Sequence, residues 1–356
     1  MGDRKIKILV VIGARPQFIK HAPFDFAARD KINIVTIHTG QHYDSNMSQV
    51  FFDQLKIRKP DYILATGGGQ HGEQTGRMLQ EIEPILLKET PDYVLVYGDT
   101  NSTLAGALVA SKLNIPVIHV EAGLRSFNKE MPEEINRILT DHVSSLLFTS
   151  TERGVQNLAT EGIEENVFFT GDIMADAVKL AESVITNVEP RLHEPYYYVT
   201  IHRPYNTDEP NRMHLILDVL NQADHRVVFP IHPRTKNLCK SFGIRFDSYT
   251  NIQFIEPASY FDNIKYLMDA AHVITDSGGL QKEAYILKTP CITIRSETEW
   301  TETLTDAWNV LCFDDLSRIP ILLKREVGVH HPTLYGNGQA ATQIISLILE
   351  HSNLKG

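Results

Sequence analysis

The stretch Tyr93–Thr103, which reads YVLVYGDTNST, indicates how the chain folds. Five apolar or aromatic residues in a row are typical of a strand that is buried on both faces of a parallel sheet. The polar, glycine-containing GDTNST that follows is typical of a turn into a helix. The same pattern returns at Ile115–Arg125, which reads IPVIHVEAGLR. Strands that alternate with helices predict an α/β fold with parallel sheets.

Further apolar runs extend this rhythm along the chain. The candidate strands are Ile8–Ile12, Ile34–His38, Tyr93–Tyr97, Val117–Val120, Leu146–Thr149, Tyr197–Ile201, Val227–Ile231, Ile252–Ile255, Val273–Thr275 and Cys291–Ile294. A chain of 356 residues exceeds what one core usually organises, so we expect two Rossmann-like domains. The segment Glu189–Pro195 breaks the rhythm and is the candidate linker. We expect a first domain at 1–172, a second at 173–339, and a C-terminal helix at 340–356 that packs back on the first.

Bulk properties exclude several classes of protein. A formal net charge of −10 disfavours nucleic-acid binding, which needs clustered Lys and Arg. No apolar stretch approaches the ~20 residues of a membrane span, and the start of the chain does not resemble a signal peptide, so we expect a cytoplasmic protein. Three scattered cysteines do not make a disulfide framework. No clustered ligand motif is present, and we expect no metal.

Carboxylates follow two neighbouring strands of the first half. Asp99 comes after one strand and Glu121 after the next. Open α/β sheets bind ligands at the carboxyl ends of their strands, so this pair favours an acid–base site. Asp99 alone could be a helix N-cap. Glu133 could simply complement a helix dipole and pair with Arg137 four residues later, and it becomes functional only beside the other two carboxylates.

Basic residues begin the first predicted helix. The first strand is followed by GARPQFIK, residues 13–20, rather than by a dinucleotide-binding Gly-x-Gly-x-x-Gly. Pro16 suits the first turn of a helix, near whose positive end Arg15 and Lys20 would then lie. The two side chains could clamp a phosphate, or they could be a solvated pair on a helix face. The motif alone leaves both interpretations open.

A turn in the second half has the composition of a phosphate site. Ser277, Gly278 and Gly279 follow a strand and start a helix, so backbone N–H groups there could approach a diphosphate. Glu283, about one turn later, could accept hydrogen bonds from a ribose. A lone Ser-Gly-Gly is a weak signal, and the acid that follows makes it more specific for a nucleotide diphosphate.

Histidine and arginine occur together after two other strands of this half. His202 is followed by Arg203, and His232 comes two residues before Arg234. A lone histidine is more often structural. Two such pairs at successive strand ends favour anion binding.

Together these motifs resemble the non-hydrolysing UDP-N-acetylglucosamine 2-epimerase family, from about Ile6 to Leu349. The resemblance rests on GARP at 13–16, GDT at 98–100, EAGLR at 121–125, PEE at 132–134, HR at 202–203 and DSGG at 276–279. It implies a GT-B fold with its active site in the cleft between two domains, a homodimer, a UDP-sugar substrate and no cofactor. The implied reaction inverts C2 of a UDP-linked amino sugar, such as UDP-GlcNAc to UDP-ManNAc, for surface polysaccharide precursors.

The resemblance also implies roles for individual residues. The catalytic set would be Asp99, Glu121, Glu133, His202 and Lys20. Substrate or UDP would be bound by Arg15, Arg125, Arg137, Arg203, His232, Ser277, Gly278, Gly279 and Glu283. A hydrolysing epimerase, a GT-B glycosyltransferase and a non-catalytic nucleotide-sugar sensor remain as alternatives.

Three positions depart from the better-known members of that family. Those members carry Glu where Gln17 and Lys282 stand, and Arg where Trp300 stands. Several segments are more similar to the subgroup that acts on UDP-2,3-diacetamido-2,3-dideoxy-glucuronate. Losing two acids and gaining a base suits a sugar with a carboxylate at C6. We therefore expect that acidic sugar to be turned over more efficiently than UDP-GlcNAc.

Overall fold

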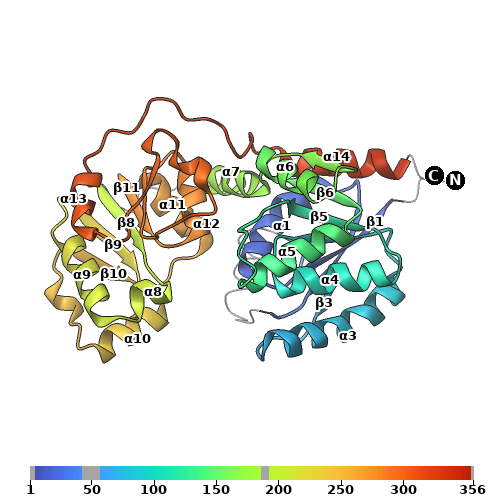
Figure 1. Cartoon of the computed structure of the whole chain (residues 1–356), viewed down its shortest axis with the longest axis horizontal. Coiled ribbons are helices and arrows are strands. Elements are labelled where there is room, and N and C mark those ends of the chain that lie inside the picture. Colours follow the sequence, from blue (N-terminus) through green and yellow to red (C-terminus); the bar gives the residue numbers. More distant parts are fainter. Residues whose placement is uncertain (1–4, 42–56, 186–191, 354–356) are drawn as a thin grey trace. The chain divides into compact units, whose positions relative to one another are not determined.

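The computed structural model describes residues 5–41, 57–185 and 192–353 (Figure 1). The chain divides into two compact units, residues 1–180 with 334–356 and residues 181–333. Part of the expected linker, residues 189–191, lies outside the described residues. Each unit contains one parallel sheet, which confirms the expected α/β class.

The first unit has a seven-stranded sheet in the order β3-β2-β1-β4-β5-β6-β7. Its strands are β1 (Lys7–Ile12), β2 (Asn33–His38), β3 (Tyr62–Ile63), β4 (Tyr93–Tyr97), β5 (Val117–Ala122), β6 (Leu146–Thr149) and β7 (Val167–Phe169). Its helices are α1 (Arg15–Ala28), α3 (His71–Glu89), α4 (Asn101–Lys112), α5 (Pro132–Val143), α6 (Glu152–Thr160), the start of α7 (Ile173–Ile185) and α14 (Ala340–Asn353). Helix α14 packs against α1, so the C-terminal segment belongs to this unit.

The second unit has a six-stranded sheet in the order β10-β9-β8-β11-β12-β13. Its strands are β8 (Tyr196–Thr200), β9 (Arg226–Pro230), β10 (Ile252–Ile255), β11 (His272–Thr275), β12 (Cys291–Thr293) and β13 (Asn309–Leu311). Its helices are α8 (Pro204–Thr207), α9 (Pro210–Asn221), α10 (Pro233–Ser241), α11 (Tyr260–Asp269), α12 (Gly278–Ile286) and α13 (Ile319–Leu322), with short 3-10 turns at Phe246–Ser248, Thr301–Ala307 and Leu316–Arg318.

Both sheets are doubly wound, and the strand that comes first in the chain lies in the interior of its sheet. In each, the first strand lies between the second and the fourth, so the crossover helices change face at that point. Ligands of such folds bind beside this switch point, at the carboxyl ends of the strands. The residues after β1, β4 and β5 in one unit, and after β8, β11 and β12 in the other, are therefore the places to look for a site.

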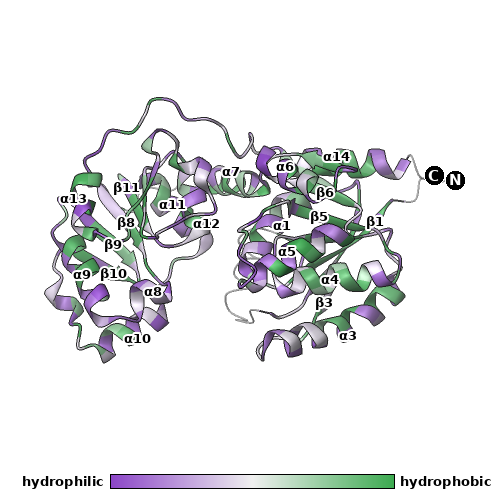
Figure 2. Cartoon of the chain, viewed as in Figure 1, coloured by the Kyte–Doolittle hydropathy of each residue, from purple (hydrophilic) through white to green (hydrophobic). Residues whose placement is uncertain are grey.

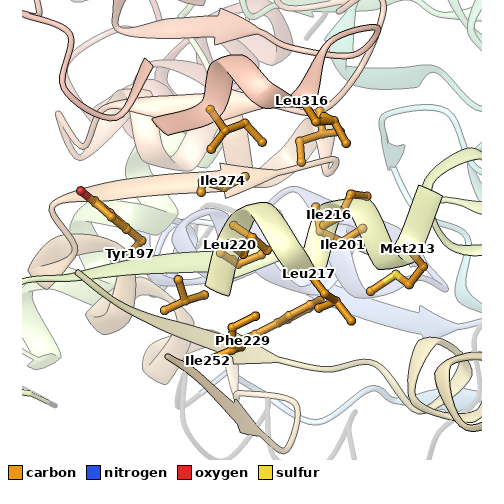
Figure 3. Close-up of a cluster of buried hydrophobic side chains, with 14 of the residues drawn as sticks. Tyr197, Ile201, Met213, Ile216, Leu217, Leu220, Phe229, Ile252, Ile274 and Leu316 are labelled. Atoms are coloured by element: carbon orange, nitrogen blue, oxygen red, sulfur yellow. The ribbon is translucent and has the colours of Figure 1, made fainter. Parts of the chain in front are cut away.

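The cores consist of the strands and the inner faces of the helices, as the hydropathy colouring shows (Figure 2). In the second unit, Met213, Leu217 and Leu220 of α9 are fully buried in a cluster with Phe229 of β9 and Ile274 of β11 (Figure 3). Fully burying such a side chain stabilises a fold by about 1.5–3 kcal/mol. This cluster of buried side chains supports the strands whose carboxyl ends carry the polar residues.

The sequence analysis missed strands β3, β7 and β13. All three are edge strands of two or three residues. An edge strand pairs on one side only and needs no continuous apolar run, so periodicity does not mark it. The strands that carry the candidate site lie inside the sheets, and most of their bounds agree with the prediction within one residue.

Candidate active site

Glu121 lies at the carboxyl end of β5 in a strained backbone conformation. Its φ is +73°, which non-glycine residues rarely adopt, and the pairing of β5 with β6 shifts register between Val120 and Ala122. Bulges and left-handed residues of this kind often re-aim a side chain at a functional site. The strand therefore ends by turning a carboxylate in a direction that regular strand geometry would not give it.

The Glu121 carboxylate pairs with Lys20 of α1, and both side chains are buried. Gly98 lies against this pair. A Cβ at position 98 would be 3.3 Å from Glu121 Oε2 and 3.5 Å from Lys20 Nζ. The φ of Gly98, +62°, also favours glycine. The structure thus brings together the ends of β4 and β5 and the first turns of α1.

Asp99 is ion-paired and partly exposed. Arg137 of α5 donates to its Oδ2 at 2.5 Å, and 31% of the Asp99 side chain is exposed. The N-cap of α4 is Thr100, whose side chain accepts from the backbone N–H of Thr103. The alternative that Asp99 merely caps a helix is therefore wrong. Its carboxylate is partly open to solvent and is held in place by Arg137.

The expected Glu133–Arg137 pair is replaced by a Glu134–Arg137 pair at 2.8 Å. Glu134 is buried and also accepts from the backbone N–H groups of Ser126 and Phe127. Burial opposes ionisation, but these donors and Arg137 together lower the pKa of Glu134. Glu133 lies in the same first turn of α5 and is exposed. The two adjacent acids thus have different environments.

Arg137 bridges Asp99 and Glu134. Burial alone would lower the pKa of its guanidinium, but the two carboxylates raise it. Asn136, on the same helix, donates to the backbone carbonyl of Asp99 at 2.9 Å. Helix α5 therefore fixes both the backbone and the side chain of Asp99, and Arg137 contacts the candidate site through that carboxylate.

Arg125, which the sequence analysis expected to bind ligand, is enclosed. Its guanidinium donates to Asp141 at 2.7 Å, to both carboxylate oxygens of Glu161 at 2.7 Å, and to the Leu124 carbonyl. Only 1% of its side chain is exposed. We therefore no longer include Arg125 in the ligand-binding set.

Gln17 also acts within the fold. Its side-chain carbonyl accepts from the N–H groups of Gly13 and Ala14 at 2.8 and 3.0 Å, and its amide donates to the Tyr97 carbonyl and Thr103 Oγ1, each at 3.0 Å. All of its hydrogen-bonding capacity is used, because an amide has two donors and a carbonyl accepts two bonds. Arg15, at the start of the same helix, is half-buried.

In the second unit, Asp276 organises the loop after β8. It is fully buried and accepts from the backbone N–H groups of His202 and Arg203 and from Asn206. The Nδ1 atom of His202 lies 3.2 Å from Asp276 Oδ1. Burial lowers the pKa of His202 although Asp276 opposes the shift, so the imidazole is neutral near pH 7. Arg203 is exposed beside it.

Helix α12 begins as the sequence predicts. Ser277 is its N-cap, and its Oγ accepts from the N–H of Leu280. A Cβ at Gly278 would lie 2.4 Å from Glu299 Oε1, whereas one at Gly279 would meet no atom closer than 4.0 Å. The N-terminus of α12 is therefore crowded at Gly278 and open at Gly279. Glu283 is buried on the same helix.

His232 lies at the start of another helix of this unit. It is the N-cap of α10 and accepts from the N–H of Arg234.

Lys282 is buried against Trp300, with its Nζ 4.0 Å from the ring centroid. A cation over an indole face is a favourable contact. Two of the three departures from the better-known family members, Lys282 and Trp300, therefore contact each other. The third, Gln17, is uncharged and hydrogen-bonded inside the first unit. The positive charge added by Lys282 is thus engaged with an indole ring within the protein.

Sequence reasoning missed the residues that hold the candidate site in place. These are Gln17, His119, Glu134, Asn136, Asp141 and Asn206. Their side chains are buried polar groups, which are normally hydrogen-bonded and therefore signal a network. Such residues are visible in a sequence only as polar interruptions of apolar runs, as His119 is in IPVIHV.

Comparison with known proteins agrees with this geometry. Residues 25–349 match the model of the UDP-N-acetylglucosamine 2-epimerase family. The chain is 46% identical to the UDP-2,3-diacetamido-2,3-dideoxy-D-glucuronate 2-epimerase of Pseudomonas aeruginosa, over 95% of this chain and 98% of the relative. It is 44% identical to the UDP-N-acetylglucosamine 2-epimerase of Methanocaldococcus jannaschii, over 96% and 99%.

Solved structures give the same result. The M. jannaschii enzyme in complex with UDP-GlcNAc and UDP superposes with a TM-score of 0.86 at 42% identity, over 98% of this chain and all of the other. The enzyme from Neisseria meningitidis bound to UDP-GlcNAc gives 0.86 at 28% identity, over 97% and 100%. The expected GT-B-like architecture is confirmed. The chain belongs to the UDP-N-acetylglucosamine 2-epimerase family and is an epimerase of UDP-linked N-acetylated amino sugars.

Proposed function

We propose that the chain interconverts UDP-GlcNAc and UDP-ManNAc, that carboxylates of the first unit move the C2 proton, and that strand ends of the second unit hold UDP. The observation that carries this proposal is Glu121, a buried carboxylate on a left-handed backbone, paired with Lys20 beside Gly98. Such strain persists only where the surrounding structure imposes it, and it is typical of active sites.

The chemistry requires several positioned acids. The hydrogen on C2 of an amino sugar is not next to a carbonyl, so direct removal is too slow. Departure of UDP from C1 gives the ring oxocarbenium character and makes the C2 proton removable. A carboxylate takes the proton to give UDP and a glycal, and UDP adds back while a proton arrives on the opposite face. Some carboxylates transfer protons and others stabilise the ring charge.

The first unit offers carboxylates in different environments for this chemistry. Glu121 is paired with Lys20 and Asp99 with Arg137, and we propose that these carboxylates accept a proton or stabilise positive charge on the ring. Glu133 is exposed and remains our third catalytic candidate. Arg15, at the start of α1, stays in the proposed ligand-binding set because anions are favoured at a helix N-terminus.

The second unit offers donors for a diphosphate. Ser277 and the open backbone at Gly279 begin a helix, where N–H groups and the helix dipole favour a phosphate. His202 and Arg203 follow β8, and we propose that the exposed Arg203 donates to the departing phosphate while His202, held by Asp276, contacts the substrate beside it. His232 and Glu283 stay in the set as proposed contacts to the nucleotide.

The neutral sugar is our proposed substrate because Lys282, the added positive charge, is engaged with Trp300 within the protein. UDP-2,3-diacetamido-2,3-dideoxy-glucuronate is the second candidate, and the 46% identity to the Pseudomonas enzyme favours it. The test compares kcat/KM for both nucleotides with the purified protein and identifies the products by NMR. A higher value for UDP-GlcNAc with UDP-ManNAc as product supports the proposal. A higher value for the acidic sugar selects the second candidate, and free ManNAc with UDP would indicate a hydrolysing enzyme.

We also propose that the chain forms a homodimer through α5. Ile135 and Leu139, four residues apart on this helix, are exposed, as are its N-cap residue Met131 and Phe127 just before it. An apolar stripe of this kind is typical of a protein interface. Light scattering should give twice the monomer mass for the wild type and one monomer mass for Ile135→Lys. A monomeric wild type would overturn this assignment.

Cytoplasmic location is also part of the proposal. All three cysteines, at 239, 291 and 312, are buried and unpaired, which suits a reducing compartment. Among the described residues, no helix is long and apolar enough to cross a membrane.

A further inference from the structure

His119 and Asp141 form a buried pair directly beneath the proposed catalytic carboxylates, and the mechanism above uses neither. His119 lies in β5, two residues before Glu121, and is fully buried. Its Nδ1 is 2.6 Å from Asp141 Oδ1, and its Nε2 is 2.8 Å from the carbonyl oxygen of Gly98. Each ring nitrogen therefore faces an oxygen.

The hydrogen bonds hold the ring at both nitrogens. A backbone carbonyl only accepts, so Nε2 donates to the Gly98 carbonyl. Asp141 Oδ2 accepts from Arg125 at 2.7 Å and from the N–H of Gly123 at 3.1 Å. Burial opposes ionisation of Asp141, but His119 and Arg125 lower its pKa. Asp141 therefore links the His119 ring to the backbone of Gly123.

The pair holds the backbone on both sides of the candidate site. Gly98 precedes Asp99, and its N–H also donates to the Val120 carbonyl at 3.0 Å. Gly123 follows Glu121 after one residue, and a Cβ there would lie 2.3 Å from the Gly154 carbonyl oxygen. Both glycines have positive φ, and because glycine has many other accessible conformations, these hydrogen bonds restrict each to the one observed.

We propose that His119, paired with Asp141, is a positioning residue that fixes Gly98 and Gly123 and thereby sets the Asp99 and Glu121 carboxylates relative to each other. The inference rests on the proposed roles of those two carboxylates. It acts through geometry, because a displacement of about 1 Å in a catalytic group can cost roughly 10²-fold in rate.

Two substitutions separate the two hydrogen bonds of the ring. In His119→Gln the amide nitrogen reaches the position of Nε2 and keeps the bond to Gly98. In His119→Asn the shorter amide reaches only the position of Nδ1 and keeps the bond to Asp141. We expect kcat of the Gln variant to stay within about fivefold of wild type and kcat of the Asn variant to fall roughly 10²-fold, with KM for the UDP-sugar changed less than about threefold in both.

A purely structural role would make activity follow thermal stability. Melting temperatures are therefore measured for both variants, and activity is assayed well below the lower one. Equal kcat values in the two folded variants would overturn the positioning role. If either variant does not fold, Asp141→Asn is measured in the same way. A roughly 10²-fold lower kcat with little change in KM supports the inference, and an unchanged kcat overturns it.

The same experiments distinguish this inference from the proposed function. C2 deuterium exchange is recorded on the wild type in parallel. Absence of exchange by the wild type would refute the proposed function, whereas normal exchange by the wild type and equal kcat in both variants would refute only the role of His119.

Discussion

Asp99 and Asp276 follow topologically equivalent strands, β4 and β11, each of which lies beside the first strand of its sheet. Asp99 is 31% exposed and is held through its side chain by Arg137. Asp276 is fully buried, and its carboxylate accepts from the backbone of the neighbouring loop. The same residue type at equivalent places in the topology is thus our proposed reactive group in one unit and a loop anchor in the other.

The residues around these two aspartates differ between the units in the same way. The strand ends of the first unit contain a left-handed Glu121 and ion pairs to Lys20 and Arg137, an arrangement that suits the movement of charge. Those of the second unit contain a helix N-terminus with an open glycine, Gly279, which suits a bound anion. We infer that the first unit carries the proton chemistry and the second unit carries nucleotide affinity.

The largest effect should come from Glu121→Gln. Removing the buried carboxylate should lower turnover by about 10²- to 10⁴-fold, the scale of lost acid–base catalysis, and leave UDP affinity unchanged in calorimetry. Glu89→Gln is the matched control. Glu89 also pairs with a lysine, Lys7, but near the opposite end of the strands, so its loss should leave turnover near wild type. Equal losses in the two variants would indicate a general effect of breaking an ion pair.

Asp99→Asn should lower turnover by at least about 10²-fold, because the amide cannot accept the proton or stabilise the ring charge. Thr100→Ala separates this effect from helix capping. It removes the N-cap of α4 and should cost about 1 kcal/mol in unfolding free energy with little change in turnover. If Thr100→Ala loses as much activity as Asp99→Asn, the integrity of α4 and not the carboxylate is limiting.

Gly279→Ala should weaken UDP binding roughly tenfold, equivalent to ~1.4 kcal/mol, because the methyl group fills the open space at the start of α12. Its melting temperature should not fall, since no atom lies closer than 4.0 Å and alanine is favoured over glycine in a helix. Gly278→Ala should displace the carboxylate of Glu299, the movable end of a partly exposed side chain, with little change in melting temperature. Unchanged UDP affinity in Gly279→Ala would show that the phosphate does not bind at the N-terminus of this helix.

The smallest effect concerns the adjacent acids of α5. The pKa of Glu134 is lowered in the folded protein, so its ionisation stabilises the fold above the unfolded pKa of about 4.3, and this contribution is lost as the pH falls through the folded pKa. Glu134→Gln should cost about 1–3 kcal/mol near neutral pH, with the difference shrinking in acid. Exposed Glu133→Gln should unfold like wild type and lose activity. Stability is measured by urea unfolding at several pH values. If Glu133→Gln is the destabilised variant and Glu134→Gln the stable, inactive one, the structural and catalytic roles of the two acids are exchanged.

The sequence predicted the interior strands well because a parallel strand buried on both faces needs an unbroken apolar run, as in YVLVY at 93–97. It also predicted that carboxylates and small residues would follow those strands. It could not separate Glu133 from Glu134, because one residue of rotation around a helix decides which acid is buried. Nor could it show that all hydrogen-bonding groups of Gln17 are used and that Lys282 contacts the ring of Trp300, since both depend on tertiary packing.

The most direct test of the central claim is hydrogen exchange at C2 in D₂O. Purified protein is incubated with UDP-GlcNAc in the presence of EDTA and without added cofactor, and the sugar is followed by NMR. The account predicts that deuterium enters C2 as UDP-ManNAc forms, that Glu121→Gln loses this exchange while it still binds UDP, and that Gly279→Ala regains it at high substrate concentration. Epimerisation by the wild type without deuterium at C2, or full exchange by Glu121→Gln, would contradict the account.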